Sequence, residues 1–275
     1  DAAELILEHN LYGLDIDDRA FQLAYFSVLM KARQYSRRIL AHHPCVHLCA
    51  IAESDGLQKW SDLSGHDFAV EQLDLDSQFI DIADYLIDTF RDAKEYGSLL
   101  RVERRDYIGL LEYIRRIQDE GGNLLMAAWI DDISQHMPAL AEQAKLLSRT
   151  YDIVVTNPPY MGSGNMDASL SKYVKDNFKE YKSDLFSACM VRFTKMTKRL
   201  GYLGFLSPYV WMFISSYEKL RQYFIQEKSI QTLIQFEYSA FEEATVPICT
   251  FVLQNSCILK KGTYLRLTEY RGGME

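Results

Sequence analysis

The strongest pattern in this chain is an apolar run that stops abruptly at polar residues and prolines. It covers residues 151–156, with three β-branched residues at 153–155, and continues as Asn-Pro-Pro-Tyr at 157–160. A short apolar run of this kind is typical of a buried parallel strand, and the prolines indicate a rigid loop after it. Because open α/β sheets bind ligands at the carboxyl ends of their strands, we expect a functional site at residues 157–160.

Weaker patterns predict strands and helices on both sides of this run. Apolar residues spaced by three and four positions indicate amphipathic helices, and short apolar runs indicate strands. Strands are expected within residues 11–17, 46–53, 201–208, 230–236 and 241–253, and helices at 1–10, 19–40, 77–94, 107–118, 139–147, 184–199 and 210–224. This alternation predicts an α/β fold that is interrupted by a long, mostly helical stretch at residues 55–149.

The composition is that of a globular protein with a substantial core. The chain has 275 residues, of which 48% are hydrophobic, and this length allows one large domain or two small ones. It has no long apolar stretch and no basic segment leading into an apolar core at its start, so neither membrane insertion nor secretion is expected. The cysteines are scattered and odd in number, which favours reduced thiols in a cytoplasmic protein over a zinc site. They are Cys45, Cys49, Cys189, Cys249 and Cys257.

The charge of the chain argues against a strong grip on nucleic acid by its own surface. The formal net charge is −8 and the sequence pI is about 5.3. Contacts to phosphates need clustered Lys and Arg. Basic clusters occur at residues 33–38, 101–105 and 195–199, but solvated helix faces account for each of them better than DNA contacts do. If the substrate is a nucleic acid, most of the binding should come from regions outside this chain.

The side chains at residues 157–160 suit the activation of an amine on a planar base. Such an amine is a poor nucleophile because its lone pair is delocalised into the ring. The Asn157 side-chain oxygen and the Pro158 carbonyl could each accept one N–H, which would favour a pyramidal nitrogen with a directed lone pair. Tyr160 could stack on the base, with Pro159 fixing the turn. The alternative is an ordinary strand and turn with a surface tyrosine.

The motif Asn157-Pro158-Pro159-Tyr160 resembles the catalytic motif of amino-group methyltransferases that use S-adenosylmethionine, above all the N6-adenine-specific DNA methyltransferases. Residues 157–162, followed by 182–186, resemble the PglX-type methyltransferases of bacterial BREX phage-defence systems. The resemblance implies direct methyl transfer to a flipped adenine in double-stranded DNA, with other defence-system subunits as further partners. An RNA or protein-glutamine N-methyltransferase and a non-catalytic interaction module are the alternatives.

The same resemblance assigns a cofactor-binding role to three residues near the start of the chain. Asp15, at the end of the expected strand at 11–17, would bind the ribose hydroxyls, and Ile16 would lie against the adenine ring. Glu53, after the expected strand at 46–53, would reach the adenine. The alternative for this region is a solvated acidic turn in which Asp17 or Asp18 caps the next helix, and both readings can hold together, since Asp18 can cap while Asp15 binds.

Two further residues take a substrate-binding role from the resemblance. Asp184 lies in the stretch Lys-Ser-Asp-Leu-Phe, which matches a motif that helps to build the target pocket. Phe241 holds the place of a second aromatic residue that clamps the flipped base from the face opposite Tyr160, and without the earlier motif it would read as a core residue. Residues 161–166 are rich in Gly and small polar residues, which suits a mobile loop closing over the base.

The resemblance also implies that the fold is incomplete. The expected fold is a doubly wound, mostly parallel Rossmann-like methyltransferase sheet whose first strand and glycine-rich cofactor loop would precede the helix ending at residue 10. We therefore expect an internal fragment that is inactive by itself and has a gap in its sheet. Its parts would be the cofactor side at 1–54, a helical insertion at 55–149 and the catalytic part at 150–275. Residues 97–99 resemble a recurring patch of large defence methyltransferases to which no reaction step is attached.

Overall fold

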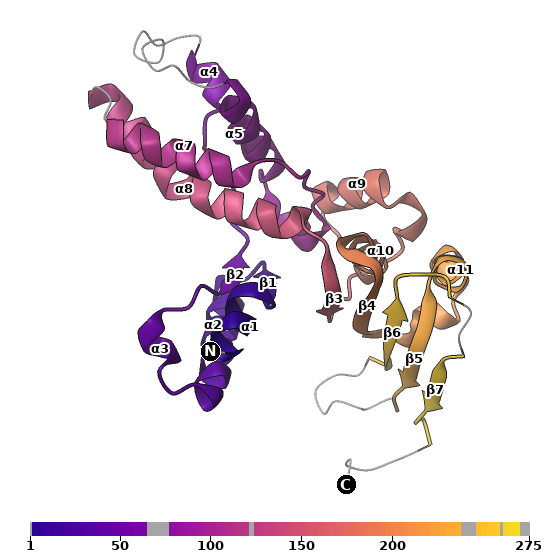
Figure 1. The fold of residues 1–275 in the computed structure, drawn as a ribbon. Coiled ribbons are helices and arrows are strands. Elements are labelled where there is room, and N and C mark those ends of the chain that lie inside the picture. Colours follow the sequence, from indigo (N-terminus) through magenta and orange to yellow (C-terminus); the bar gives the residue numbers. More distant parts are fainter. Residues whose placement is uncertain (1, 65–76, 121–123, 238–245, 259–260, 270–275) are drawn as a thin grey trace. The chain divides into compact units, whose positions relative to one another are not determined.

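The computed structural model describes residues 2–64, 77–120, 124–237, 246–258 and 261–269. They form two compact units, residues 1–149 and residues 150–275, which are described separately below (Figure 1).

The first unit begins with a small strand–helix–strand motif. It consists of α1 (Ala2–His9), β1 (Tyr12–Asp15), α2 (Asp18–Tyr35), α3 (Ile39–His42) and β2 (His47–Ala50). The two strands are parallel, with Tyr12 opposite His47 and Asp15 opposite Ala50, so their carboxyl ends meet at one edge. The predicted continuous helix at 19–40 is wrong, because the backbone becomes extended at Ser36 and α3 is a separate turn.

The rest of the first unit is helical, as predicted. It contains α4 (Trp60–Ser64), α5 (Ser77–Thr89), α6 (Ala93–Tyr96), the 3₁₀ turn η1 (Gly97–Leu99), α7 (Tyr107–Glu120) and α8 (Leu124–Ser148). Helices α5, α7 and α8 pack together through buried aliphatic side chains, and α8 also contacts β1 and β2 (Figure 1). The helix predicted at 139–147 is only the last part of α8, which runs through Pro138.

The second unit is a five-stranded sheet with flanking helices. Its elements are β3 (Tyr151–Thr156), α9 (Ala168–Asn177), η2 (Lys179–Tyr181), α10 (Leu185–Met196), β4 (Thr197–Pro208), η3 (Tyr209–Met212), η4 (Ser215–Tyr217), α11 (Glu218–Glu227), β5 (Ser229–Gln235), β6 (Ile248–Gln254) and β7 (Thr263–Arg266). The strand order is β3-β4-β6-β5-β7. The helix predicted at 210–224 is wrong in its first half, where η3 and η4 replace it.

The strand pairings confirm the predicted α/β class with a mostly parallel sheet. Among the described residues, β1–β2, β3–β4 and β5–β7 are parallel, and β6 runs antiparallel to both β4 and β5. No helix in this described part combines the length and the apolar content that crossing a membrane requires.

One face of the sheet in the second unit is buried and the other is open. Phe205 and Phe251 are buried side by side, and Phe224 of α11 packs against Phe251. On β3, however, Ile153 is 64% exposed and Val155 is 76% exposed. The prediction of a fully buried strand is therefore wrong, since the described residues of this unit cover only one face of it.

Candidate active site

The Asn-Pro-Pro-Tyr motif directly follows β3. Because β3 and β4 are parallel and pair Thr156 with Phe205, the ends of both strands lie at one edge of the sheet. The Pro158 side chain is buried there, whereas Asn157 and Tyr160 are exposed. The Tyr160 hydroxyl donates a hydrogen bond to Asn157 Oδ1 at 2.7 Å. Two of the side chains predicted to meet a substrate, Asn157 and Tyr160, are thus brought together, and they bind each other.

The Tyr160 ring packs against a cluster of aromatic side chains. The Tyr160 ring meets Phe186 edge-on at 6.5 Å between centroids, and Phe186 stacks on Tyr217 at 5.4 Å. Burial raises the pKa of Tyr160 and raises that of Tyr217 to about 12, so both phenols stay neutral around neutral pH. Sequence reasoning missed Tyr217. Its segment was predicted to be helical, and nothing in that segment indicates a contact with Phe186, which lies far away in the sequence.

Asp184 has a clear local role in the structure. Its Oδ1 accepts the backbone N–H of Phe186, which caps α10, and the backbone N–H of Met161, both at 3.1 Å. Burial raises the pKa of this carboxyl, although the backbone donors partly offset the shift. The bond to Met161 and an antiparallel bridge to Gly162 tie the loop at 161–166 to the start of α10. The substrate-binding role of Asp184 remains a prediction, and Phe241 lies outside the described residues.

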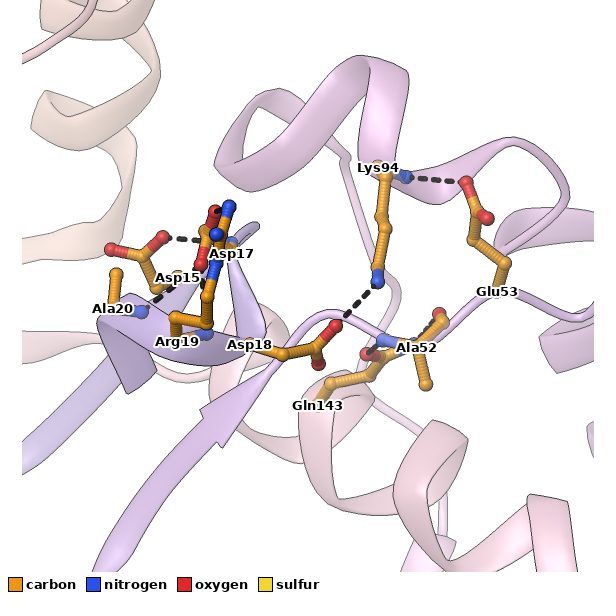
Figure 2. A network of polar contacts seen from close by, with 9 residues as sticks. All are labelled: Asp15, Asp17, Asp18, Arg19, Ala20, Ala52, Glu53, Lys94 and Gln143. Carbon is orange, nitrogen blue, oxygen red and sulfur yellow. Dashed lines mark hydrogen bonds and ion pairs between the residues drawn. The ribbon is translucent and has the colours of Figure 1, made fainter. Parts of the chain in front are cut away.

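The carboxyl ends of β1 and β2 hold the residues predicted to bind the cofactor. Asp15 ends β1, and its backbone carbonyl accepts the N–H of Ile51 at 2.8 Å, so the chain after β2 runs beside it. Asp15 at the end of β1 and Glu53 after the end of β2 therefore lie on the carboxyl-end side of this sheet (Figure 2), and Ile16 directly follows Asp15. Ile16 is 51% exposed. Among the described residues, the amide of Asp17 is the one donor to the Asp15 carboxylate, at 2.9 Å.

The helix after β1 is capped by Asp17 and not by Asp18. Asp17 Oδ1 accepts the N–H groups of Arg19 and Ala20 at 2.7 and 3.1 Å, and these bonds lower the pKa of Asp17. Asp18 instead pairs with the Lys94 ammonium at 3.0 Å. Of the two capping residues that the sequence left open, Asp17 is thus the cap, and Asp15 has no capping role and carries an exposed carboxylate at the end of its strand.

One side chain and one backbone amide of the helical region hold the chain just after β2. The carboxamide of Gln143, which is fully buried on α8, donates to the carbonyl of Ala52 and accepts its N–H, each at 2.8 Å (Figure 2). The next residue, Glu53, accepts the backbone N–H of Lys94 through Oε1 at 3.1 Å. Sequence reasoning missed Gln143, although a lone Gln on the apolar face of a helix is a signal of a buried hydrogen-bonding role.

This arrangement fits the adenosine part of S-adenosylmethionine. An exposed carboxylate can accept bonds from ribose hydroxyls, an exposed apolar side chain lies next to it, and a second carboxylate keeps one oxygen without a donor among the described residues. In the same described part of the chain, no group of three or more His, Cys, Asp and Glu is placed to hold a metal ion.

Comparison with known proteins identifies relatives of known family. The sequence profile of the Eco57I restriction-modification methylase family matches residues 9–241. The adenine-specific methyltransferase BrxX of Escherichia coli O9:H4 (strain HS) is 33% identical over 93% of this chain. The adenine-specific methyltransferase PglX of Lacticaseibacillus casei (strain Zhang) is 36% identical over 98% of it. The chain spans 22% of the length of each of these relatives.

Similarity to solved structures is weaker. The ATP-dependent Type ISP restriction-modification enzyme LlaBIII bound to DNA matches 48% of this chain and 11% of its own, with 16% identity and a TM-score of 0.38. That score is too low to support an argument.

Proposed function

Because the chain belongs to the Eco57I restriction-modification methylase family, we propose that it contributes to N6 methylation of adenine in DNA with S-adenosylmethionine as methyl donor. The observation that carries this proposal is the Asn157–Tyr160 pair at the carboxyl end of β3, with Pro158 fixed between them. The activity belongs to restriction-modification or phage defence.

The residues at the ends of β1 and β2 would hold the cofactor. Asp15 accepts the ribose hydroxyls, Ile16 covers one face of the adenine, and Glu53 accepts its amine through the oxygen that Lys94 leaves free. The cofactor supplies a methyl group on a sulfonium centre, which is reactive enough for direct transfer without a covalent enzyme intermediate.

The residues after β3 would prepare the acceptor. The Asn157 oxygen and the Pro158 carbonyl accept the two N–H groups of the amine, which leaves its lone pair directed at the methyl group. The Tyr160 hydroxyl has to leave Asn157 when the amine arrives, while its ring stacks on the base. Neither acceptor is basic enough to keep a proton, so the proton lost from the amine passes to water. Correct positioning would supply much of the rate enhancement.

The substrate is double-stranded DNA, held mainly by regions outside this chain. The net charge of −8 supports this division of labour, since phosphate binding needs clustered positive charge. We propose other subunits of the same defence system as further partners.

The test is transfer of a labelled methyl group by the full-length protein. We expect incorporation into adenine of double-stranded DNA, and a loss of at least about a hundred-fold in Asn157→Ala with S-adenosylmethionine binding retained. The matched control is Asn10→Ala, which changes an asparagine that precedes the start of β1. Label that enters RNA or protein glutamine instead would replace the DNA assignment, and no cofactor binding at all would favour an interaction module.

A further inference from the structure

We propose that the turn at residues 92–100, which contains α6 and η1, is a wall of the adenosine-binding site, with Gly97 and Lys94 as its positioning residues. The inference rests on the proposed function, because it concerns the same cofactor. It assigns a role to residues 97–99, to which the sequence attached no reaction step, and brings part of the helical region into the site.

Gly97 lies directly against the residue that would cover the adenine. A Cβ atom placed on Gly97 would come within 3.0 Å of Ile16 Cγ2, which is tighter than almost all real contacts. The backbone of Gly97 is buried and has φ of +54°, a conformation that glycine adopts far more readily than other residues. The turn therefore supports Ile16 from one side, while about half of the Ile16 surface stays exposed for a ligand.

Lys94 connects the same turn to both strands. Its backbone N–H donates to Glu53 Oε1 at 3.1 Å, and its ammonium pairs with Asp18 at 3.0 Å (Figure 2). Glu53 follows β2, and Asp18 lies two residues after Ile16. One residue of the turn thus fixes the direction of the Glu53 carboxylate and braces the segment that carries Ile16.

The turn is itself firmly anchored, so it can hold its neighbours in place. Leu99 and Leu100 are buried at its end. At its start, the N–H of Asp92 donates to Asp55 at 3.2 Å and the carbonyl of Phe90 accepts the N–H of Ser54 at 3.0 Å. A displacement of the turn would therefore move Ile16 and Glu53 together, and the affinity for an adenosine ligand should respond.

The experiment is calorimetric titration of full-length protein with S-adenosylmethionine and with S-adenosylhomocysteine. We expect Gly97→Ala to weaken both ligands about ten-fold, because the added Cβ pushes Ile16 from its position. The KM for S-adenosylmethionine should rise by a similar factor while kcat at saturation stays unchanged, since the turn holds the adenosine and not the reacting methyl group. Ile16→Leu removes the contacting methyl group, so it should recover part of the loss when combined with Gly97→Ala.

The matched control is Gly56→Ala. Gly56 also has a positive φ, +83°, but a Cβ there meets nothing within 4 Å. Equal affinities of the Gly97→Ala and Gly56→Ala proteins would overturn the inference. Asp15→Ala separates this failure from that of the proposed function: if it leaves binding unchanged, the whole cofactor assignment falls.

A second variant keeps the inference testable if Gly97→Ala does not fold. Lys94→Met removes the pair with Asp18 but keeps the backbone bond to Glu53, and we expect binding about three-fold weaker, within the range of a partly exposed ion pair. Lys59→Met breaks a comparable pair with Asp88 elsewhere in the unit and should leave binding unchanged. The same affinity in both variants would remove Lys94 from the site.

Discussion

At the scale of single residues, the hydrogen bond between Tyr160 and Asn157 distinguishes the role of the Tyr160 hydroxyl from that of its ring. The hydroxyl donates a hydrogen bond to Asn157 Oδ1, whereas the ring packs against Phe186. Under the proposed function only the ring stacks on a base, and we infer that the hydroxyl orders Asn157 until a substrate amine replaces it.

We therefore expect Tyr160→Phe and Tyr160→Ala to differ strongly. Phe keeps the stacking ring, so single-turnover methyl transfer should stay within about three-fold of wild type, whereas Ala should lose the stacking contact, about 1–3 kcal/mol or about 5- to 150-fold. The fluorescence of 2-aminopurine at the target base reports on base flipping independently. Tyr264→Phe, on the exposed edge strand β7, is the control. Equal losses in both Tyr160 variants would show that the hydroxyl itself takes part in the reaction.

Asp184 gives a prediction about pH and stability. Burial raises the pKa of this carboxyl in the folded state above its usual value, so the folded protein binds the proton more tightly than the unfolded chain. The contribution of Asp184 to stability should therefore fall as pH rises from about 4 through the folded-state pKa. Asp184→Asn keeps the oxygen that accepts from Phe186 and Met161 but carries no charge.

Urea unfolding between pH 4 and 7 checks this prediction. The stability of Asp184→Asn relative to wild type should increase with pH, and Asp184→Ala should follow the same trend about 1 kcal/mol below Asp184→Asn, because it also loses the helix cap. Asp176→Asn, an exposed aspartate on α9, should show no such trend. A decrease in the relative stability of Asp184→Asn with rising pH would contradict the assigned direction.

At the scale of elements, a buried side chain of α8 holds the chain just after β2. Gln143 makes both hydrogen bonds that the Ala52 backbone would otherwise make in a sheet. Gln143→Leu keeps the size but leaves both backbone groups unpaired, so the free energy of unfolding should fall by about 2–3 kcal/mol. Because Glu53 is the next residue, binding of S-adenosylmethionine should weaken as well.

The control for this change is Gln135→Leu, an exposed glutamine on the same helix, which should alter neither quantity. Urea unfolding and calorimetric titration measure the two effects separately. A Gln143→Leu protein with wild-type stability and affinity would show that α8 does not support the end of β2.

The open face of β3 makes a second prediction for an element. A Cβ placed on Gly204 would meet Val155 Cγ2 at 3.6 Å, yet Val155 remains 76% exposed, and its neighbour on the same face, Ile153, is 64% exposed. An apolar surface of this kind favours association. We expect the 275-residue chain to self-associate as its concentration rises, and Val155→Lys to reduce this association.

Sedimentation velocity over a range of concentrations measures it. Ile225→Lys replaces an equally exposed apolar side chain on α11, at 69% exposure, and should have no effect. A wild-type chain that stays monomeric at high concentration would show that the open face of β3 does not drive self-association.

At the scale of the whole molecule, the sequence predicted what is periodic or local and missed what depends on distant partners. The strand before Asn157 and the strand before Asp15 were readable, because apolar runs and their polar ends lie within a few residues. The break of α2 at Ser36 was not readable, since apolar spacing continues across it. Lys94 and Gln143 were missed for a further reason: each meets its strand from more than forty residues away. The exposure of Val155 depends on what covers the sheet, which no local pattern states.

The charge of the whole chain leads to the last prediction, which concerns DNA. Although the net charge is −8, residues 19–52 contain five basic residues and no acidic ones, namely Arg19, Lys31, Arg33, Arg37 and Arg38. This is too few for tight binding, since each phosphate contact releases only about one counterion and so raises the affinity only modestly.

We expect the 275-residue chain to bind a short duplex with a Kd no tighter than about 100 µM at physiological salt, and the full-length protein to bind at least about ten-fold tighter with a steeper salt dependence. Fluorescence anisotropy at several salt concentrations measures both. Tight, salt-sensitive binding by the short chain would place a DNA-binding surface on this chain, and loss of that binding in Arg33→Ala with Arg37→Ala would locate it at the end of α2 and the residues that follow.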